Sequence, residues 1–353
     1  MHLFTSSFNA RQPRTVHIAL LLALCALFCV SLETVTTRYF ARVSRTERRR
    51  EAEYNAALAI RSRKADHKLS VLVAGNSVLL QGVDFPALER SLGPDLEVKR
   101  SVFENTSFLD WYYGLSRYFR AGSRPDVVVL VLTPWQLVSD ATDGDYTVQM
   151  MVDGRDLLSF ANETGADRNR MSGMALDKAS FFFGTRAEIR TWILNTVLPD
   201  LPSLTQFFRF DVSVADNHNA PEVASQRLNR LRKLCDQYGV KFVLVVPPAR
   251  EDSGVTAIAD AAAAQGVPAL IPIRVLPKSD YADLVHLNTQ GAAKFTPALA
   301  KSLRQILLSP PVQTPARISA PTLPGNTAWS SATLAKPGES ADRAGHALVP
   351  TSF

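Results

Sequence analysis

Residues 70–82 read SVLVAGNSVLLQG, and this stretch decides how the rest of the chain is interpreted. Its first half is continuously apolar, which is typical of a β-strand buried on both faces. The strand pattern stops at Gly75, Asn76 and Ser77, and a helix-like run follows. A serine at a strand-to-helix turn is held at a sheet edge, with backbone N–H groups of the next turn pointing toward its Oγ. Because those groups can also stabilise an oxyanion, Ser77 is a candidate nucleophile.

A serine hydroxyl needs a base, and histidine is the usual choice near neutral pH. Of the six histidines in the chain, His286 is the one with a carboxylate at a useful spacing, Asp283, three residues earlier. Side chains at i and i+3 of a turn can meet, so Asp283 can hold the imidazole in one tautomer and stabilise its charged form. The sequence therefore predicts Ser77, His286 and Asp283 as catalytic residues.

Apolar, strand-like runs alternate with helical patterns from residue 69 to residue 308. This alternation predicts an α/β fold with a doubly wound, flavodoxin-like parallel sheet and helices on both faces. Ligands of such folds bind at the carboxyl ends of the strands. Residues 138–220 break the alternation and predict a mostly helical insertion. The expected strands are 69–75, 96–103, 125–134, 240–248 and 267–273, and the expected helices are 85–93, 107–120, 221–239, 253–266 and 289–308.

An apolar run near the N-terminus predicts a transmembrane signal anchor over residues 16–34, preceded by a cytoplasmic segment, 1–15. The uninterrupted part, Val16 to Leu32, has 17 residues, which is near the lower limit for a spanning helix. No convincing pair of small residues follows it for signal cleavage. The positive-inside rule taken literally places the large domain in the cytoplasm, but long translocated domains can override it. We expect a single-pass inner-membrane protein with a periplasmic domain.

The excess of basic residues lies in one short segment. Between Arg38 and Lys64 there are nine Lys or Arg and three Glu, a surplus of 9 − 3 = 6, which equals the net charge of the whole chain, +6. This distribution predicts a basic, membrane-proximal stalk over residues 35–68 and argues against binding of nucleic acid. The Pro-, Ser- and Thr-rich tail, 309–353, is predicted to be disordered.

No metal or cofactor is predicted from the motifs. Asp140, Asp143 and Asp145 form an acidic turn whose spacing does not fit an EF-hand loop. The segment after the first strand lacks the Lys-Ser/Thr of a P-loop and the spacing of a dinucleotide fingerprint.

Two sequence blocks resemble those of the SGNH/GDSL hydrolase superfamily. Gly75-Asn76-Ser77, followed by Gly82, is similar to the block that carries the nucleophile, and DLVHLNTQG (283–291) is similar to the closing Asp-x-x-His block. The resemblance covers roughly residues 69–305 and implies an SGNH fold with a serine nucleophile. Asn76 in place of Asp, together with the anchor and basic stalk, resembles membrane-anchored members that accompany polysaccharide O-acetylation.

The chain departs from the family where the oxyanion hole is expected. The family takes one donor from a glycine N–H in its second block and another from the asparagine of a Gly-x-Asn in its third. This chain reads FENTSFLDW (103–111) and VLTPWQL (131–137) there, so Thr133 stands at the asparagine position. Trp135 follows a strand at the functional edge and is a candidate for stacking on a sugar. The candidates for oxyanion or substrate binding are Asn76, Asn105, Thr106, Thr133, Trp135 and Gln136.

Two classes of function remain open from the sequence. The resemblance implies an esterase or O-acyltransferase, first of all one that transfers acetyl groups to an extracellular polysaccharide with a multispanning membrane acyltransferase as partner. The alternative is a catalytically degenerate module that binds glycan or scaffolds a polysaccharide assembly complex. The complete Ser-His-Asp set favours catalysis, whereas Thr133 favours the alternative.

Overall fold

The computed structural model describes residues 14–61, 68–140, 142, 145–197, 219–251 and 254–308. All of them belong to one compact unit, Met1–Ser309. The tail predicted over 309–353 and the segment 1–13 lie outside the described residues.

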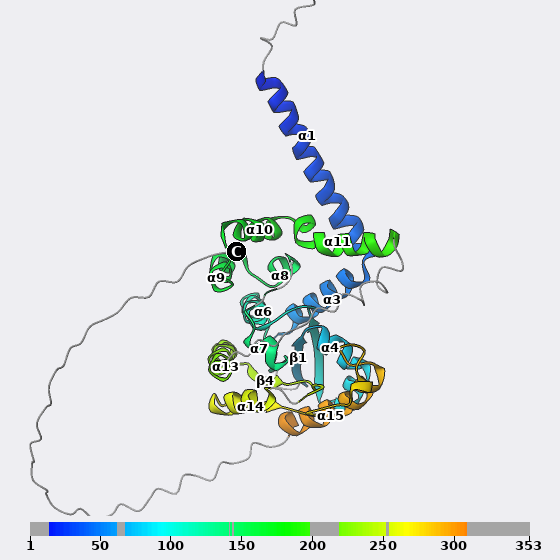
Figure 1. Cartoon of the computed structure of the whole chain (residues 1–353), viewed down its shortest axis with the longest axis vertical. Coiled ribbons are helices and arrows are strands. Elements are labelled where there is room, and N and C mark those ends of the chain that lie inside the picture. The colour runs from blue at the N-terminus through cyan, green and yellow to red at the C-terminus, as the bar shows by residue number, and fades with distance from the viewer. Residues whose placement is uncertain are drawn as a thin grey trace, which may run out of the picture. The chain divides into compact units, whose positions relative to one another are not determined.

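Five parallel strands form a single sheet in the order β2-β1-β3-β4-β5 (Figure 1). The register aligns the last residues of the three strands that end beside Ser77, because Gly75 lies opposite both Val102 and Val131. This order is that of flavodoxin-like folds, and it confirms the predicted doubly wound α/β fold. The strands are β1 (Leu69–Gly75), β2 (Leu96–Val102), β3 (Val127–Val131), β4 (Lys241–Val245) and β5 (Ala269–Leu270).

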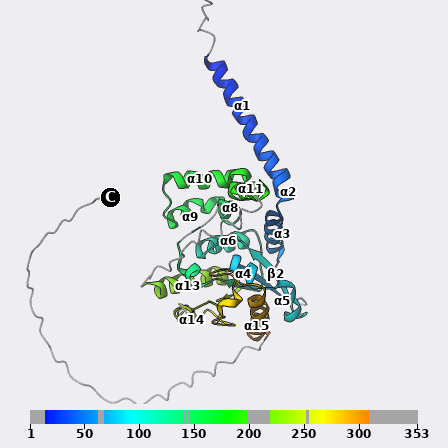
Figure 2. The same cartoon turned by 45° about the vertical axis from the view of Figure 1, so that its right-hand side comes forward.

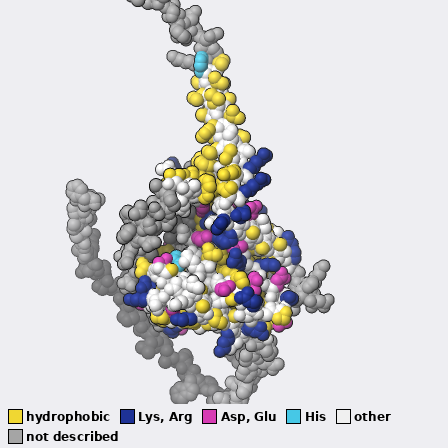
Figure 3. All heavy atoms as spheres, turned by 90° about the vertical axis from the view of Figure 1, so that its right-hand side faces the viewer, with side chains coloured by type: hydrophobic (Ala, Val, Ile, Leu, Met, Phe, Trp, Pro, Cys, Tyr) yellow, Lys and Arg dark blue, Asp and Glu magenta, His cyan; other side chains and the backbone are white. Residues whose placement is uncertain are grey.

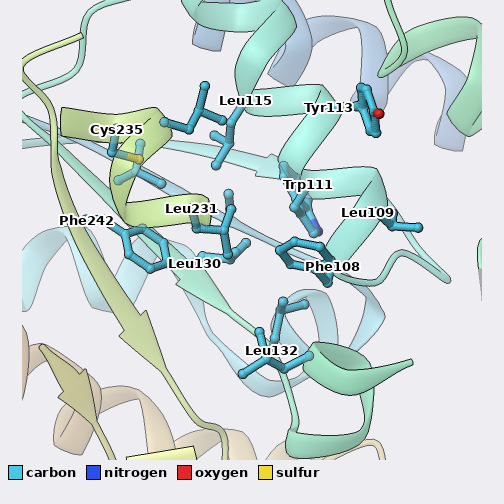
Figure 4. Close-up of a cluster of buried hydrophobic side chains, with 14 of the residues drawn as sticks. Phe108, Leu109, Trp111, Tyr113, Leu115, Leu130, Leu132, Leu231, Cys235 and Phe242 are labelled. Carbon is cyan, nitrogen blue, oxygen red and sulfur yellow. The ribbon is translucent and has the colours of Figure 1, made fainter. Parts of the chain in front are cut away.

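Alternate residues of the strands enter two separate hydrophobic cores. Val71 and Val73 of β1 pack on one face of the sheet, and Leu72 and Ala74 pack on the other. A strand buried on both faces therefore reads as a continuous apolar run, as the sequence of β1 does. The first core is covered by α4 (Ser77–Gly82), α5 (Phe85–Leu92) and α15 (Thr289–Leu308), and the second by α6 (Phe108–Arg120), α13 (Ala220–Gln237) and α14 (Val255–Ala264). Figure 4 shows the second core, with Phe108 and Trp111 of α6 beside Leu130 of β3 and Leu231 of α13.

Four strands are shorter than the sequence predicts. Strand β2 ends one residue before its expected bound, 103, and β3, β4 and β5 were expected over 125–134, 240–248 and 267–273. These three expected ranges contain prolines, which have no N–H to give to a sheet: Pro125 and Pro134, Pro247 and Pro248, and Pro268 and Pro272.

The insertion is helical in its described part. Helix α7 (Pro134–Val138) ends where the predicted insertion begins, and the insertion contains α8 (Asp145–Met150), the 3₁₀ turn η2 (Gly154–Asp156), α9 (Leu157–Glu163), α10 (Arg168–Ala179) and α11 (Phe181–Val197). Helices α8, α10 and α11 pack against one another. Residues 141, 143, 144 and 198–218 of the insertion lie outside the described residues.

An apolar helix leads into the folded unit from the N-terminal side (Figures 1 and 2). It comprises α1 (Arg14–Val35), a π-helical turn η1 (Thr36–Phe40) and α2 (Ala41–Val43). Within the described ranges, the stretch Val16–Val43 is the one helix long and apolar enough to cross a membrane, and none of its most apolar window is buried inside the protein.

The middle of the predicted stalk, 35–68, is part of the folded unit, and residues 62–67 lie outside the described residues. Helix α3 (Arg45–Ala59) packs against β2. The Glu53 carboxylate accepts a hydrogen bond of 2.8 Å from the backbone N–H of Val102, and Arg49 donates to the Val102 carbonyl at 3.0 Å. Residues 47, 50 and 53 of the predicted stalk are thus buried on one face of α3, and Glu53 with Arg49 fastens that helix to β2.

Candidate active site

Ser77 is the first residue of α4, directly after the end of β1. The strand ends in glycine because there is no room for a side chain. A Cβ at position 75 would lie 2.9 Å from the Val131 carbonyl oxygen and 3.0 Å from Cδ2 of Leu79. Because residue 75 is glycine, β3 and α4 can both lie against the end of β1, and this close packing fixes the position of Ser77.

Asn76 is fully buried and both ends of its side-chain amide are bonded. Its Oδ1 accepts from the backbone N–H of Val78 at 3.1 Å, which caps α4, and its Nδ2 donates to the Thr106 carbonyl at 2.9 Å. That Asn76 contributes to substrate binding stays a prediction; its side chain ties the serine turn to the loop after β2. A carboxylate at this position has no hydrogen to give to that carbonyl.

His286 lies in a loop that is closed by backbone hydrogen bonds. The N–H of Ala282 donates to the His286 carbonyl at 2.8 Å, and the N–H of Asn288 donates to the Asp280 carbonyl at 2.9 Å. Helix α15 packs close to the turn η3 (Lys278–Asp280), because a Cβ at Gly291 would lie only 2.3 Å from the Asp280 carbonyl oxygen. The glycine in the closing sequence block is thus required by this close contact.

The structure brings the three predicted catalytic residues into direct contact. His286 Nε2 lies 2.8 Å from Ser77 Oγ, and His286 Nδ1 lies 2.7 Å from Oδ2 of Asp283. The other carboxylate oxygen of Asp283 accepts the backbone N–H groups of Val285 and His286, at 2.8 Å each. Because a carboxylate can only accept, Nδ1 is assigned as the protonated nitrogen, which leaves the lone pair of Nε2 facing the serine hydroxyl.

Asp283 is held in its charged form. Partial burial alone would raise its pKa, but the hydrogen bonds from the His286 side chain and from the backbone of His286 and Val285 together lower the pKa below the ordinary value of 3.8. The carboxylate is therefore ionised at neutral pH, where it can orient the imidazole and stabilise an imidazolium. The Asp283 side chain is 54% exposed and that of His286 is 19% exposed, so the Asp283–His286 pair is accessible to solvent.

The loop after β2 presents Asn105 and conceals Thr106. Asn105 is exposed and has φ 57°, a left-handed conformation that asparagine tolerates better than most residues and that glycine adopts freely. The hydroxyl of Thr106 donates to the Phe103 carbonyl at 2.7 Å and accepts from Nε1 of Trp111 at 2.9 Å. Of these two candidates for an oxyanion donor, only Asn105 has a backbone in the glycine-like conformation and reaches the surface.

Thr133 and Gln136 are paired with each other. The Thr133 hydroxyl oxygen accepts from the Gln136 N–H at 3.3 Å, and the Gln136 side-chain oxygen accepts from the Thr133 N–H at 3.0 Å. This reciprocal capping box begins α7 at the end of β3. Trp135, between them, is 38% exposed. The structure thus places these three residues at the carboxyl edge of the strand beside β1, with the two polar side chains engaged in a helix cap.

Two apolar side chains beside the base were not singled out from the sequence. Leu284 and Val285, between Asp283 and His286, are 50% and 43% exposed. Apolar residues in the middle of a polar loop motif are the signal that points to them. In the part of the chain that the structure describes, no group of three or more His, Cys, Asp or Glu side chains is arranged to hold a metal ion.

No family model matches the chain, and no curated protein matches it. Among solved structures it is similar to LAE5, an alpha/beta hydrolase enzyme from the metagenome of Lake Arreo, Spain, with 12% identity and a TM-score of 0.35 over 69% of this chain and 98% of that chain. It is similar to TesA with 14% identity and a TM-score of 0.34, over 67% of this chain and 99% of that chain. A catalytic mutant of Axe2, an acetylxylan esterase from Geobacillus stearothermophilus, has 12% identity and a TM-score of 0.34, over 70% and 98%.

Proposed function

We propose that the chain is a membrane-anchored serine esterase or O-acyltransferase of the SGNH type. The observation that carries this proposal is the hydrogen-bonded series from Asp283 through His286 to Ser77, which joins the end of β1 to a loop 209 residues later. An orienting carboxylate, a base and a hydroxyl in this order are the arrangement by which a serine becomes nucleophilic.

The proposed reaction follows from the roles of the three groups. As Ser77 Oγ attacks an acyl carbonyl, its proton passes to His286 Nε2, and Asp283 stabilises the imidazolium that forms. The oxyanion is stabilised by the backbone N–H of Ser77 at the start of α4 and that of Asn105. Collapse forms the acyl-serine, and His286 returns its proton to the departing alcohol. A water molecule or a sugar hydroxyl then attacks the acyl-serine, with His286 taking its proton. The bond from the acyl carbon to Ser77 Oγ breaks, and His286 returns the proton to that oxygen.

The substrate class and location are proposed from the surroundings of the serine. The apolar helix Val16–Val43 would anchor the chain in the inner membrane with the domain in the periplasm. Exposed Trp135 offers a flat apolar face for a sugar ring, and Leu284 and Val285 offer apolar contact to an acyl group. These features and the resemblance to anchored SGNH proteins favour acetyl transfer to, or removal from, an extracellular polysaccharide, with a multispanning membrane protein as the source of acetyl groups.

The test is turnover of p-nitrophenyl acetate by the full chain in detergent. Ser77→Ala and His286→Ala are expected to lower kcat/KM by about 10³-fold or more, because each removes a member of the set. Ser91→Ala, at an exposed serine in α5, is the matched control and is expected to keep the wild-type rate. Turnover that is unchanged in Ser77→Ala would contradict the proposal. Acetate found on an added polysaccharide would identify a transferase.

The pairing of Thr133 with Gln136 favours a second candidate, a glycan-binding module without catalysis. Each side chain is held in the cap of α7 by its acceptor oxygen, so Thr133 has a hydroxyl fixed at the position where the family has an amide donor. In that case wild type and Ser77→Ala would both fail to turn over esters, with or without added polysaccharide, and Trp135→Ala would weaken the binding of polysaccharide measured by calorimetry.

A further inference from the structure

One face of α11 carries exposed apolar side chains, and the last two turns of the helix, residues 190–197, are exposed all round. Spacings of three, four and seven residues place Phe183, Arg190, Ile193, Leu194 and Val197 on the same side of the helix. The apolar members are 37%, 46%, 37% and 68% exposed, in chain order, and Arg190 is exposed as well. Apolar side chains with a basic residue among them are typical of helices that lie in a membrane interface.

The opposite face of α11 faces the folded unit. Glu188 accepts a hydrogen bond of 2.9 Å from Arg50 of α3, and the Trp192 ring meets the Phe40 ring edge-on with centroids 6.1 Å apart. Gly184 lies so close to α10 that a Cβ would be 2.9 Å from the Asp177 carbonyl oxygen. These contacts fix the rotation of α11, so the apolar face is turned away from the interior of the protein.

The start of α11 is attached to the end of α1. The Glu33 carboxylate accepts hydrogen bonds from the backbone N–H groups of Phe181 and Phe182 at 2.7 and 3.1 Å, and from the Ser180 hydroxyl at 2.6 Å. A carboxylate is well placed at a helix N-terminus, where the backbone N–H groups are otherwise unpaired. Figures 1 and 2 both show α11 at the end of α1 that enters the folded unit.

Basic and aromatic side chains surround the same junction. Tyr39 is 58% exposed, and Arg38 and Arg42 are exposed. In Figure 3, yellow hydrophobic side chains continue from α1 onto the surface at its foot, with dark blue Lys and Arg side chains beside them. Tyrosine and tryptophan gather at the headgroup level of membrane proteins, and basic residues there are attracted to anionic lipids.

We infer that α11 lies flat in the membrane interface, with Phe183, Ile193, Leu194 and Val197 in contact with anionic lipid. This inference rests on the proposed anchoring by α1 and not on the proposed chemistry at Ser77. The attachment of α11 to Glu33 sets its height at the end of the spanning helix, and the Arg50–Glu188 pair transmits that position to the α/β domain. The insertion thereby fixes the orientation of the domain on the bilayer.

The test attaches a fluorophore to one introduced cysteine at a time in the full chain, which is placed in phosphatidylcholine–phosphatidylglycerol vesicles with and without nitroxide-labelled lipid. Cys25 and Cys29 are replaced by alanine, and buried Cys235 is retained. The probed positions are Ile193→Cys and Val197→Cys. Val275→Cys, at an exposed valine beside the sheet, is the matched control for a position in water, and Leu22→Cys in α1 is the control for a position inside the membrane.

The account predicts that nitroxide lipid quenches the fluorophore at positions 22, 193 and 197 but not at 275, and that emission at 193 and 197 shifts to the blue. Quenching at 22 without quenching at 193 and 197 would overturn the inference alone. If 193 and 197 were then shielded from aqueous quencher, a protein partner or a second copy would be the occupant. Absence of quenching at 22 would overturn both the anchor and this inference, and would leave the proposed esterase reaction to its own test.

Discussion

The carboxyl edge of the sheet and the ion pairs around Arg50 of α3 both join distant parts of the chain through charged or polar side chains, but they differ in burial. At the sheet edge, the Asp283 side chain is 54% exposed, whereas the Arg50 side chain is 5% exposed. Exposed groups can meet a substrate, and buried ion pairs have lost their water and depend on each other. The difference separates groups placed for chemistry from groups that hold the structure together.

Arg50 is the centre of the buried group. It bonds to Glu104 at 3.0 Å and Glu188 at 2.9 Å, and its guanidinium stacks on the Tyr146 ring at 3.8 Å. Burial alone would lower the pKa of Arg50, but Tyr146, Glu104 and Glu188 raise it above the ordinary value. Arg50 therefore links the helix before β1, the loop that carries Asn105 and the insertion.

The largest effect is expected where the comparison predicts a large loss of activity with only a small loss of stability. Asp283→Asn keeps an acceptor for the N–H groups of Val285 and His286 but presents an amide to Nδ1, which favours the wrong tautomer. We expect kcat/KM for p-nitrophenyl acetate to fall by about 10²–10⁴-fold, with only a small decrease in melting temperature at neutral pH. Asp260→Asn, at an exposed aspartate of α14, is the control. A kcat/KM within a few-fold of wild type would contradict the claim that Asp283 at the sheet edge is placed for chemistry.

At the ion pairs around Arg50 we expect the converse, a loss of stability. Arg50→Ala removes the cation that buried Glu47 and half-buried Glu188 share, and we expect the free energy of unfolding to fall by about 3–5 kcal/mol. Arg48→Ala, at an exposed arginine of the same helix, is expected to change it little. Denaturant titration of the full chain in detergent measures both. Equal stability of the two variants would mean that the buried charges do not hold the regions together.

A smaller effect is expected from filling the space beside the serine turn. In Gly75→Ala the new methyl group meets the Val131 carbonyl and Leu79, and we expect about 1–3 kcal/mol of destabilisation together with a lower kcat/KM as Ser77 shifts. Gly154→Ala is the matched control, because nothing lies within 4 Å of a Cβ at that position. If Gly75→Ala matched the control in both measurements, the close approach would not determine where Ser77 stands.

The smallest effect concerns pH. The pKa of Asp283 is lower in the folded protein than its ordinary value of 3.8, so its contribution to stability is fully present above that value and is lost as the pH falls through the folded pKa. The difference in free energy of unfolding between wild type and Asp283→Asn should therefore shrink in acid. Urea titrations near neutral pH and well below 3.8 measure it. A difference that grew in acid would have the wrong sign.

The sequence predicted the elements whose pattern is local. Strand β1 and helix α15 have the predicted bounds, 69–75 and 289–308, because an apolar run between Gly75 and its flanking turns, or a helix begun after Asn288, needs no knowledge of distant residues. The Ser77–His286–Asp283 contact was also predictable, since the ends of parallel strands meet at one edge.

The buried ion pairs and the polar caps were not predictable in the same way. Arg50 and Glu53 were interpreted as part of a basic stalk, because charged residues are seldom fully buried. Their partners are far away in the chain: Arg50 bonds to Glu104 and Glu188, and Glu53 bonds to Arg100 and the Val102 N–H. Thr133 and Gln136 were interpreted through the family's asparagine, whereas Pro134 starts a helix that uses both side chains as its cap.

The most direct test of the central claim is to identify the residue that reacts with a fluorophosphonate, which forms a stable ester with an activated serine. The full chain is treated in detergent, digested and analysed by mass spectrometry, beside His286→Ala. We predict a single phosphonylated serine, Ser77, in the wild-type chain and no adduct in His286→Ala, because the hydroxyl then has no base. An unmodified Ser77 in the wild type, or equal modification in the two chains, would contradict the account.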